Sequence, residues 1–445
     1  MWLRLEPTDR VERMSLRPLS LGGLHEVIAH RLGRSFPRPT MVRIGEVSGG
    51  NPFYALELAR ALEDNPLRSD TELPRSLAEL VRLRIGALSE DVREVLLVAA
   101  SAADPTVEMV SQATGFSIDR TVELLESSDG AGVVSVAGHR VRFQHPLLAR
   151  GVYTDAGVPS RRRVHRKLAE LVTEPELRAR HLALAATSDD AVTLAALDEA
   201  VVTARARGAP AAAAELLDLA IGLGADTVQR RIAAADNHVR AGDLTTAGQL
   251  LGPVIDREPP GTPRALARAM LAAVLVHTQG YPPAVDELQR ALTDAAGDRF
   301  TTAAVRTLLA FMLVRAGRLD QASVSARTAL AEAEGPEISE PGISERGIGQ
   351  LISAALAVNA LVDHESGGGR DHAGLRRAIA LEDPALDVPV TLSASAVEAE
   401  LLIGSGEVEE AARRLAAVRD RLLVRGADTE MLWVSVNAAT LNILR

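Results

Sequence analysis

The segment Gly242-Asp243-Leu244-Thr245-Thr246-Ala247 shows how the second half of this chain folds. A glycine is followed five residues later by an alanine. Glycine permits the tight turn between two helices, and the small alanine lets those helices approach each other closely. The same pattern recurs in Gly208-Ala209-Pro210-Ala211-Ala212-Ala213, Gly317-Arg318-Leu319-Asp320-Gln321-Ala322 and Gly406-Glu407-Val408-Glu409-Glu410-Ala411.

The spacing of these turns identifies the kind of repeat. The glycines at 208, 242, 280 and 317 are 34, 38 and 37 residues apart, which is the period of tetratricopeptide-like helix pairs. The Gly367–Gly369 cluster is a weaker copy. We therefore predict a tetratricopeptide-like α-solenoid over 176–445, with an exposed loop at 335–342 and a last helix over 431–444.

Composition favours a mainly α protein and excludes several classes of function. Of the 445 residues 47% are hydrophobic but only 2% are aromatic, so alanine and leucine dominate the apolar content and favour helix. The net charge of −10 argues against nonspecific binding to nucleic acid or to anionic membranes. The absence of cysteine excludes disulfides and thiolate catalysis. No secretory signal or membrane-length apolar run occurs, so we expect a cytoplasmic protein.

The segment before the repeats has the element order of a winged-helix domain. One helix is predicted from 73 to about 88. Three more, over 90–102, 106–114 and 117–127, are followed by a hairpin of strands 133–136 and 139–143, and three helices followed by a hairpin is the winged-helix order. Such domains often bind DNA through their third helix. Here that helix, 117–126, has one arginine, Arg120, against three acidic residues, which phosphate would repel. The sequence therefore favours a winged-helix domain that serves as an internal hinge over one that binds DNA.

One basic patch follows this domain. It consists of Arg161, Arg162, Arg163, Arg166 and Lys167. Because Val164, Leu168 and Leu171 mark one buried helix face, we interpret the patch as a solvated face or an interdomain contact.

A glycine turn opens a helix near the start of the chain, in Val47-Ser48-Gly49-Gly50-Asn51-Pro52-Phe53-Tyr54. Asn51 suits the N-cap and Pro52 the first helical position. We expect Phe53, Leu56 and Leu58 to face inward, with Glu57 and Arg60 outside. Taken alone, these residues are equally consistent with an ordinary capped helix.

Four short motifs together resemble one family. The Ser-x-Gly-Asn-Pro-hydrophobic helix resembles the lid of signal-transducing ATPases with numerous domains (STAND), in particular the large ATP-binding regulators of the LuxR type. The other three motifs are Leu16-Arg17-Pro18-Leu19-Ser20, then Arg142-Phe143-Gln144-His145-Pro146-Leu147 with Val152-Tyr153, and the set Arg161, His165 and Ala169.

The resemblance implies a division of the chain and a set of nucleotide contacts. Residues 1–23 would be a remnant of the nucleotide-binding domain, 24–72 a helical lid, 73–175 a winged-helix domain and 176–445 the repeats. The segment Gly50, Asn51, Pro52 and Phe53 would lie against adenine and ribose, and His145 would contact the β-phosphate of ADP. The alternative for His145 is a histidine that satisfies the start of a helix beside Pro146.

The chain departs from the family in two motifs, the phosphate-binding loop and the DNA-binding helix. A Walker A loop requires a lysine after a glycine-rich turn, but the single lysine, Lys167, has no glycine near it. No LuxR-type recognition helix occurs either. Any nucleotide contact is therefore expected to be vestigial. We expect neither enzymatic activity nor a cofactor, since ATP or ADP is expected only in the complete relatives. The two histidines of His25-Glu26-Val27-Ile28-Ala29-His30 do not share a helix face. The loop residues Asp363, His364, Glu365, Asp371 and His372 are expected to be solvated, so no metal is predicted.

These observations predict the regulatory or sensor part of a LuxR-family ATP-dependent transcriptional regulator. It would act without catalysis and bind a protein partner or a small-molecule inducer on the repeats. Self-association is left open as a further option, and we expect neither DNA binding by this chain alone nor membrane binding. Two alternatives remain: a winged-helix DNA-binding transcription factor acting through 73–175, and a stand-alone repeat scaffold.

Overall fold

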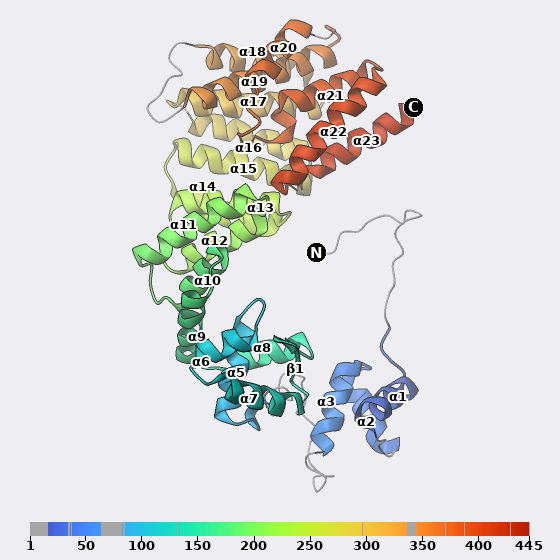
Figure 1. Cartoon of the computed structure of the whole chain (residues 1–445). Coiled ribbons are helices and arrows are strands. Elements are labelled where there is room, and N and C mark those ends of the chain that lie inside the picture. Colours follow the sequence, from blue (N-terminus) through green and yellow to red (C-terminus); the bar gives the residue numbers. More distant parts are fainter. Residues whose placement is uncertain are drawn as a thin grey trace. The chain divides into compact units, whose positions relative to one another are not determined.

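The computed structural model of the chain describes residues 17–33, 36, 38–63, 82, 85–130, 132–295, 297–335, 344–369, 371–386, 388–427 and 429–444. Contacts divide the chain into two compact units, Met1–Leu171 and Val172–Arg445, and helices dominate both (Figure 1). The predicted boundary between 175 and 176 lies in the first turn of α10 (Pro175–Ala185).

The first unit begins with three helices, α1 (Leu21–Leu32), α2 (Arg38–Ser48) and α3 (Pro52–Glu63). Ser20 caps α1 by accepting a hydrogen bond from Gly23 N at 3.2 Å. Leu24, Ile28 and Leu58 are fully or almost fully buried where the three helices meet. One sequence prediction is wrong here: Glu57 is not outside but fully buried, and it forms an ion pair with Arg60 at 2.8 Å.

The element order predicted for residues 90–143 is confirmed. Its core is a run of apolar residues on α5, including Val95, Leu96 and Val98, which packs against the neighbouring helices and the hairpin. In the hairpin, Val134 pairs with Phe143 and Val136 with Val141. The elements are α5 (Glu90–Ser101), α6 (Val107–Thr114), α7 (Ile118–Gly130), β1 (Val134–Ala137), β2 (Arg140–Phe143), α8 (Pro146–Asp155) and α9 (Val158–Leu171).

The second unit is a solenoid of paired antiparallel helices, as predicted. It begins with α10, and every described element after it, apart from one short 3-10 turn, is an α-helix. They are α11 (Ala191–Ala206), α12 (Pro210–Gly222), α13 (Val228–Arg240), α14 (Leu244–Arg257), α15 (Thr262–Gln279), α16 (Tyr281–Asp294), α17 (Arg299–Arg315), α18 (Leu319–Ala333), α19 (Glu345–Glu365), α20 (His372–Leu381), η1 (Val390–Leu392), α21 (Ala394–Gly404), α22 (Val408–Arg425) and α23 (Met431–Leu444).

The glycines of the repeat pattern lie between the members of successive helix pairs. Gly242, for example, separates α13 from α14 with φ at +81°, a left-handed conformation that glycine adopts without strain. The alanine five residues later, Ala247, is completely buried. The alanines at 213, 322 and 411 are equally buried, so the glycine–alanine pattern does mark helix turns and helix contacts.

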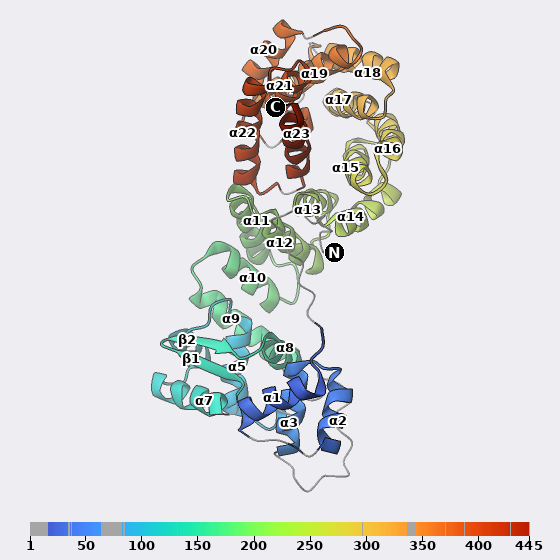
Figure 2. The same cartoon turned by 90° about the vertical axis from the view of Figure 1, so that its right-hand side faces the viewer.

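The solenoid also closes on itself, which the sequence pattern did not predict. The turn after α22 approaches the turn between α11 and α12, at Gly426 and Gly208. The two backbones come so close that a Cβ atom on Gly208 would stand 2.2 Å from the carbonyl oxygen of Val424. Nearby, the Thr429 hydroxyl donates to the Val239 carbonyl at the end of α13. Figure 2 shows the last helices returning beside the first ones.

Some predictions concern residues outside the described part of the chain. They are 1–16 of the expected nucleotide-binding remnant, 64–72 at the end of the expected lid, most of the helix expected over 73–88, and 336–342 of the expected loop. Among the described helices, none has the length and apolar character needed to cross a bilayer.

Candidate functional site

The glycine turn before α3 has the predicted conformation. Gly49 and Gly50 have φ values of +58° and +76°. The Asn51 side chain accepts a hydrogen bond from Tyr54 N at 3.0 Å, and Pro52 is the first residue of the helix. Asn51 is therefore an N-cap, which satisfies one of the free N–H groups of the first helical turn.

Gly50 also brings two of the sequence motifs into contact. The Leu19 N–H donates to the Gly50 carbonyl at 2.9 Å. A Cβ atom on Gly50 would stand 2.6 Å from the Cβ atom of Pro18 and 2.8 Å from the Leu19 carbonyl oxygen. Only glycine fits this position, because both the positive φ and the close approach exclude a side chain.

His145 and Phe53 meet face to face although the first lies before α8 and the second on α3. Their ring centroids are 3.7 Å apart and their planes are inclined by 13°. His145 is also the N-cap of α8, since its Nδ1 accepts from Leu147 N at 3.2 Å. An accepting Nδ1 carries no proton, so the neutral ring carries its proton on Nε2.

These contacts give four of the five predicted nucleotide-contact residues structural functions. Gly50 makes a close backbone approach, Asn51 and His145 cap helices, and Phe53 stacks on the imidazole. Pro52 is exposed at the start of α3. The structure thus brings Phe53 and His145 together, and it satisfies the alternative reading in which His145 stabilises a helix start.

An open hollow of about 300 Å³ is lined in part by Leu19, the residue whose N–H donates to the Gly50 carbonyl. Its lining is mostly apolar, and Glu46 is its one charged residue. A phosphate group requires cations or converging N–H groups. The acidic side chain of Glu46 makes this lining unsuitable for phosphate.

The predicted basic patch is not one continuous cationic surface. The Arg161 guanidinium lies 5.2 Å from the centre of the Tyr153 ring and donates to the Tyr153 carbonyl at 3.3 Å. The Tyr153 hydroxyl in turn lies 2.8 Å from His165 Nε2. Lys167 pairs with Glu170 at 3.0 Å. Arg162 is partly buried, whereas Arg163 and Arg166 are exposed.

The third helix of the predicted winged-helix order, α7, has its arginine engaged in ion pairs. Arg120 donates to Asp91 at 2.9 Å and to Glu123 at 3.1 Å. The hydrogen bonds with Asp91 and then Glu123 raise the pKa of Arg120 above its ordinary value. This side chain is held by carboxylates rather than presented to a phosphate backbone.

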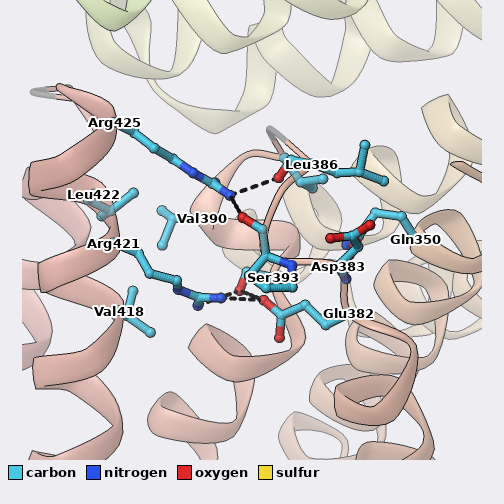
Figure 3. A pocket seen from close by; sticks show the side chains of 12 residues that line it. Gln350, Glu382, Asp383, Leu386, Val390, Ser393, Val418, Arg421, Leu422 and Arg425 are labelled. Carbon is cyan, nitrogen blue, oxygen red and sulfur yellow. Dashed lines mark hydrogen bonds and ion pairs between the residues drawn. The ribbon is translucent and has the colours of Figure 1, made fainter. Parts of the chain in front are cut away.

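A second cavity lies in the solenoid between α22 and the loop after α20 (Figure 3). Its volume is about 20 Å³, which is room for about one water molecule. The buried carboxylate of Glu382 lies at its edge and accepts from Ser393 Oγ at 2.6 Å, from Ser395 N at 2.9 Å and from Arg421 at 2.9 Å. Arg425 donates to the carbonyls of Pro384 and Leu386.

The hydrogen bonds around Glu382 decide its protonation. Burial is the largest single effect and opposes ionisation, but the combined hydrogen bonds from Ser393, Ser395 and Arg421 outweigh it. The pKa of Glu382 therefore lies below its ordinary value. Sequence reasoning did not find this residue, because its partners come from two other segments, 393–395 and α22, and no local pattern marks it.

Within the described residues, no group of three or more histidine, cysteine, aspartate or glutamate side chains is arranged to hold a metal ion. His364 and His372 flank the triple-glycine turn, and the Asp371 side chain caps α20 by accepting from Ala373 N and Gly374 N.

Comparison with known proteins gives fold likeness only. No protein-family model matches the chain, and no curated protein matches it. One similar solved structure is a Signal Transduction ATPase with Numerous Domains (STAND) protein with a tetratricopeptide repeat sensor from Pyrococcus horikoshii, at 13% identity and a TM-score of 0.34 over 95% of this chain. This chain spans 63% of that protein's length. Another is a Rap protein complexed with competence and sporulation factor, at 14% identity and a TM-score of 0.37, covering 83% of this chain and 100% of that one.

Proposed function

We propose that this chain is a non-catalytic sensor module of a LuxR-type ATP-dependent regulator. Its solenoid binds a protein or peptide partner, and its first unit, a lid followed by a winged-helix domain, acts as a hinge. The observation that carries this proposal is the stacking of Phe53 on His145. Phe53 belongs to the Gly-Asn-Pro-hydrophobic motif and His145 to the Arg-Phe-Gln-His-Pro-Leu motif, the two most specific motifs of the resemblance. The stack therefore connects these motifs across the contact between the three-helix segment and the segment with the hairpin.

The absence of catalysis is the first part of the proposal. Asn51 and His145 are engaged in helix caps, and the hollow lined in part by Leu19 contains an acidic residue rather than a cation. Phosphoryl transfer depends on cations around the phosphates. Purified protein mixed with ATP and Mg²⁺ should therefore release phosphate no faster than a protein-free blank. Sustained turnover would contradict this part.

Binding of a macromolecular partner is the second part. A solenoid presents an extended surface, whereas the cavity beside Glu382 has room for about one water. We therefore favour a peptide or protein over a small-molecule inducer. The test is selection of a displayed random-peptide library on the full chain, followed by hydrogen exchange with the selected peptides bound. Protection should concentrate on the repeat helices in 172–444, and protection confined to 17–171 would contradict it.

DNA binding is the competing function, and the exposed Arg163 and Arg166 on α9 are the observation in its favour. A gel shift with mixed genomic fragments compares the original chain with the double variant Arg163→Glu and Arg166→Glu. Substituting these two side chains leaves the packing of Arg161 on Tyr153 undisturbed. We expect no shifted band at physiological salt in either case. A salt-sensitive band that disappears in the variant would favour the transcription-factor alternative.

A further inference from the structure

The turn after α22 brings the last repeats of the second unit against the first ones. We define the clasp as five residues of this turn and its end, Val424, Arg425, Gly426, Thr429 and Glu430. Gly426 meets the backbone of Gly208 in the turn between α11 and α12. The Thr429 hydroxyl donates to the carbonyls of Val239 and Arg240 at the end of α13. This junction joins residues that are 190 positions apart in the sequence.

The clasp also holds the loop between α20 and η1, which belongs to the last repeats. Arg425 donates to the carbonyls of Pro384 and Leu386 at 2.7 Å and 2.8 Å (Figure 3). Where the loop ends, Val390 N donates to the carboxylate of Glu430 at 2.8 Å. The clasp therefore contacts the first repeats on one side and its own neighbouring loop on the other.

The two sides of the clasp differ in apolar packing. On the side of the last repeats, Val390, Leu422 and Ala427 belong to one cluster of buried apolar residues, which fastens the loop to α22 and the clasp. Across the junction, none of the buried apolar clusters in the described part of the unit contains residues of both α11–α13 and α22–α23. Because burial of apolar surface is the main driving force of folding, the junction is the weaker of the two contacts.

We propose that the junction of the clasp with Gly208 and α13 opens reversibly, and that the clasp then moves as one piece with the α20–η1 loop. Opening breaks the hydrogen bond of the Thr429 hydroxyl and separates two backbones, but it divides no apolar cluster. Small rotations between successive helix pairs supply the displacement, since each pair of a solenoid contacts mainly its neighbours. The closed and open forms differ in the curvature of the solenoid and keep every helix pair.

The first experiment measures distances across the junction by electron spin resonance and uses the absence of native cysteine. Spin labels are attached to the double variant Val202→Cys on α11 and Leu423→Cys on α22, where the side chains are 67% and 60% exposed. Labels on Val192→Cys and Val202→Cys, both on α11, give the width of the distance distribution for a rigid pair. We expect the pair across the junction to show a main population and a second one at longer distance.

A substitution in the clasp should shift these populations. Thr429→Val removes the hydroxyl and keeps the shape of the side chain, while the Val239 carbonyl retains its hydrogen bond from Gly242 N at 3.0 Å. The ratio of the open to the closed form should rise about fivefold, the usual effect of one hydrogen bond. The matched control is Thr328→Val on α18, whose hydroxyl bonds within its own helix at 2.8 Å, and it should leave the ratio unchanged. Equal ratios in the three proteins, or one narrow population in all of them, would overturn the proposal.

The second experiment tests whether the loop moves with the clasp. Hydrogen exchange of the Leu386 and Val390 amides is compared in the original chain, in Thr429→Val and in Arg425→Gln. Thr429→Val leaves the contacts between the clasp and the loop in place, so both amides should exchange as in the original chain. Arg425→Gln removes the donor that holds the loop carbonyls, so exchange should become faster. Faster exchange in Thr429→Val, or unchanged exchange in Arg425→Gln, would overturn the joint movement of clasp and loop.

Discussion

The imidazole of His145 lies flat against the phenyl ring of Phe53, with 3.7 Å between the ring centroids and 13° between the ring planes. Each ring belongs to the start of a different helix, His145 as the cap of α8 and Phe53 in the first turn of α3. The stack therefore fixes the start of one helix against the start of another. Any movement between the three-helix segment and the hairpin-containing segment has to break it or carry it along.

The energy of this stack can be separated from the energy of the helix cap. The change His145→Asn replaces the ring by a residue that is an equally good N-cap, and Phe53→Ala removes the other ring. A double-mutant cycle of unfolding free energies should give a coupling of about 1 kcal/mol, the usual value for an aromatic pair. Urea unfolding of the four proteins, followed by circular dichroism, measures it.

A control for this cycle is Phe143→Ala combined with His145→Asn. Phe143 belongs to the same core but is not stacked on the imidazole. A coupling near zero between Phe53 and His145, or an equal coupling in the control pair, would show that the ring contact contributes no specific stability.

The closure of the solenoid predicts that two chemically identical substitutions differ in how much they reduce the free energy of unfolding. Gly208 and Gly317 both stand in repeat turns with φ at +72°, but a Cβ on Gly208 would meet the Val424 carbonyl oxygen at 2.2 Å while one on Gly317 would meet nothing within 4 Å. Gly317→Ala should cost about 1 kcal/mol, the penalty for a left-handed alanine. Gly208→Ala should cost at least about 1 kcal/mol more, because the backbones at 208 and 426 must separate.

Thermal unfolding with matched protein concentrations measures this difference. Hydrogen exchange adds a local readout: the amides around 424–427 should exchange faster in Gly208→Ala but not in Gly317→Ala. Equal destabilisation by both substitutions would mean that the contact between the first and last repeats is absent in solution.

The lowered pKa of Glu382 predicts that the free energy of unfolding depends on pH. Its pKa is lower in the folded chain than its ordinary value of 4.5, so folding is favoured by the ionised carboxylate. The contribution is complete above pH 4.5 and decreases as the pH falls through the lower folded value. Glu382→Gln should cost about 2 kcal/mol at pH 7, and the difference from the original chain should become smaller in acid.

The measurement is guanidinium unfolding of both proteins at pH 7 and again below pH 4. Glu199→Gln, at an exposed position, accounts for the loss of one surface charge and should show little difference at either pH. A difference between the Glu382 variant and the original chain that grows in acid would contradict the assigned direction of the pKa shift.

A second buried carboxylate, Asp294, lies between two arginines of the solenoid. It accepts from Arg264 Nε at 2.8 Å and from Arg268 Nε at 2.7 Å. The hydrogen bond from Arg264 is the main reason that the pKa of Asp294 lies below its ordinary value, with burial acting in the opposite direction. Asp294→Asn leaves both guanidinium groups beside an uncharged amide and should cost about 3 kcal/mol.

The exposed pair of Arg419 and Asp420, with 51% and 65% of the side chains accessible, provides the comparison. Asp420→Asn should cost less than about 0.5 kcal/mol. If chemical unfolding gave similar costs for the two substitutions, the Asp294 network would have no stabilising effect beyond that of a surface ion pair.

The contrast between Glu57 and Asn51 shows where sequence reasoning succeeded and where it failed within one helix. The cap at Asn51 could be predicted because a cap depends only on residues of the same turn. The burial of Glu57 could not, because it depends on what covers that side of α3. Once covered, the carboxylate is retained by pairing with Arg60 at 2.8 Å, as a buried charge requires.

The sequence by itself determined the helix pairs of the second unit, the turns at Gly208, Gly242, Gly317 and Gly406, and the helices and hairpin of 90–143. These features arise from local backbone preferences and from the periodicity of apolar residues, both of which can be read within a few turns of chain. Only the tertiary structure decided that Gly426 returns to Gly208, that Phe53 stacks on His145 and that two distant segments supply the hydrogen bonds to Glu382. The physical reason is that a local pattern fixes which face of a helix avoids water, whereas the distant face that covers it depends on small rotations accumulated over the whole solenoid.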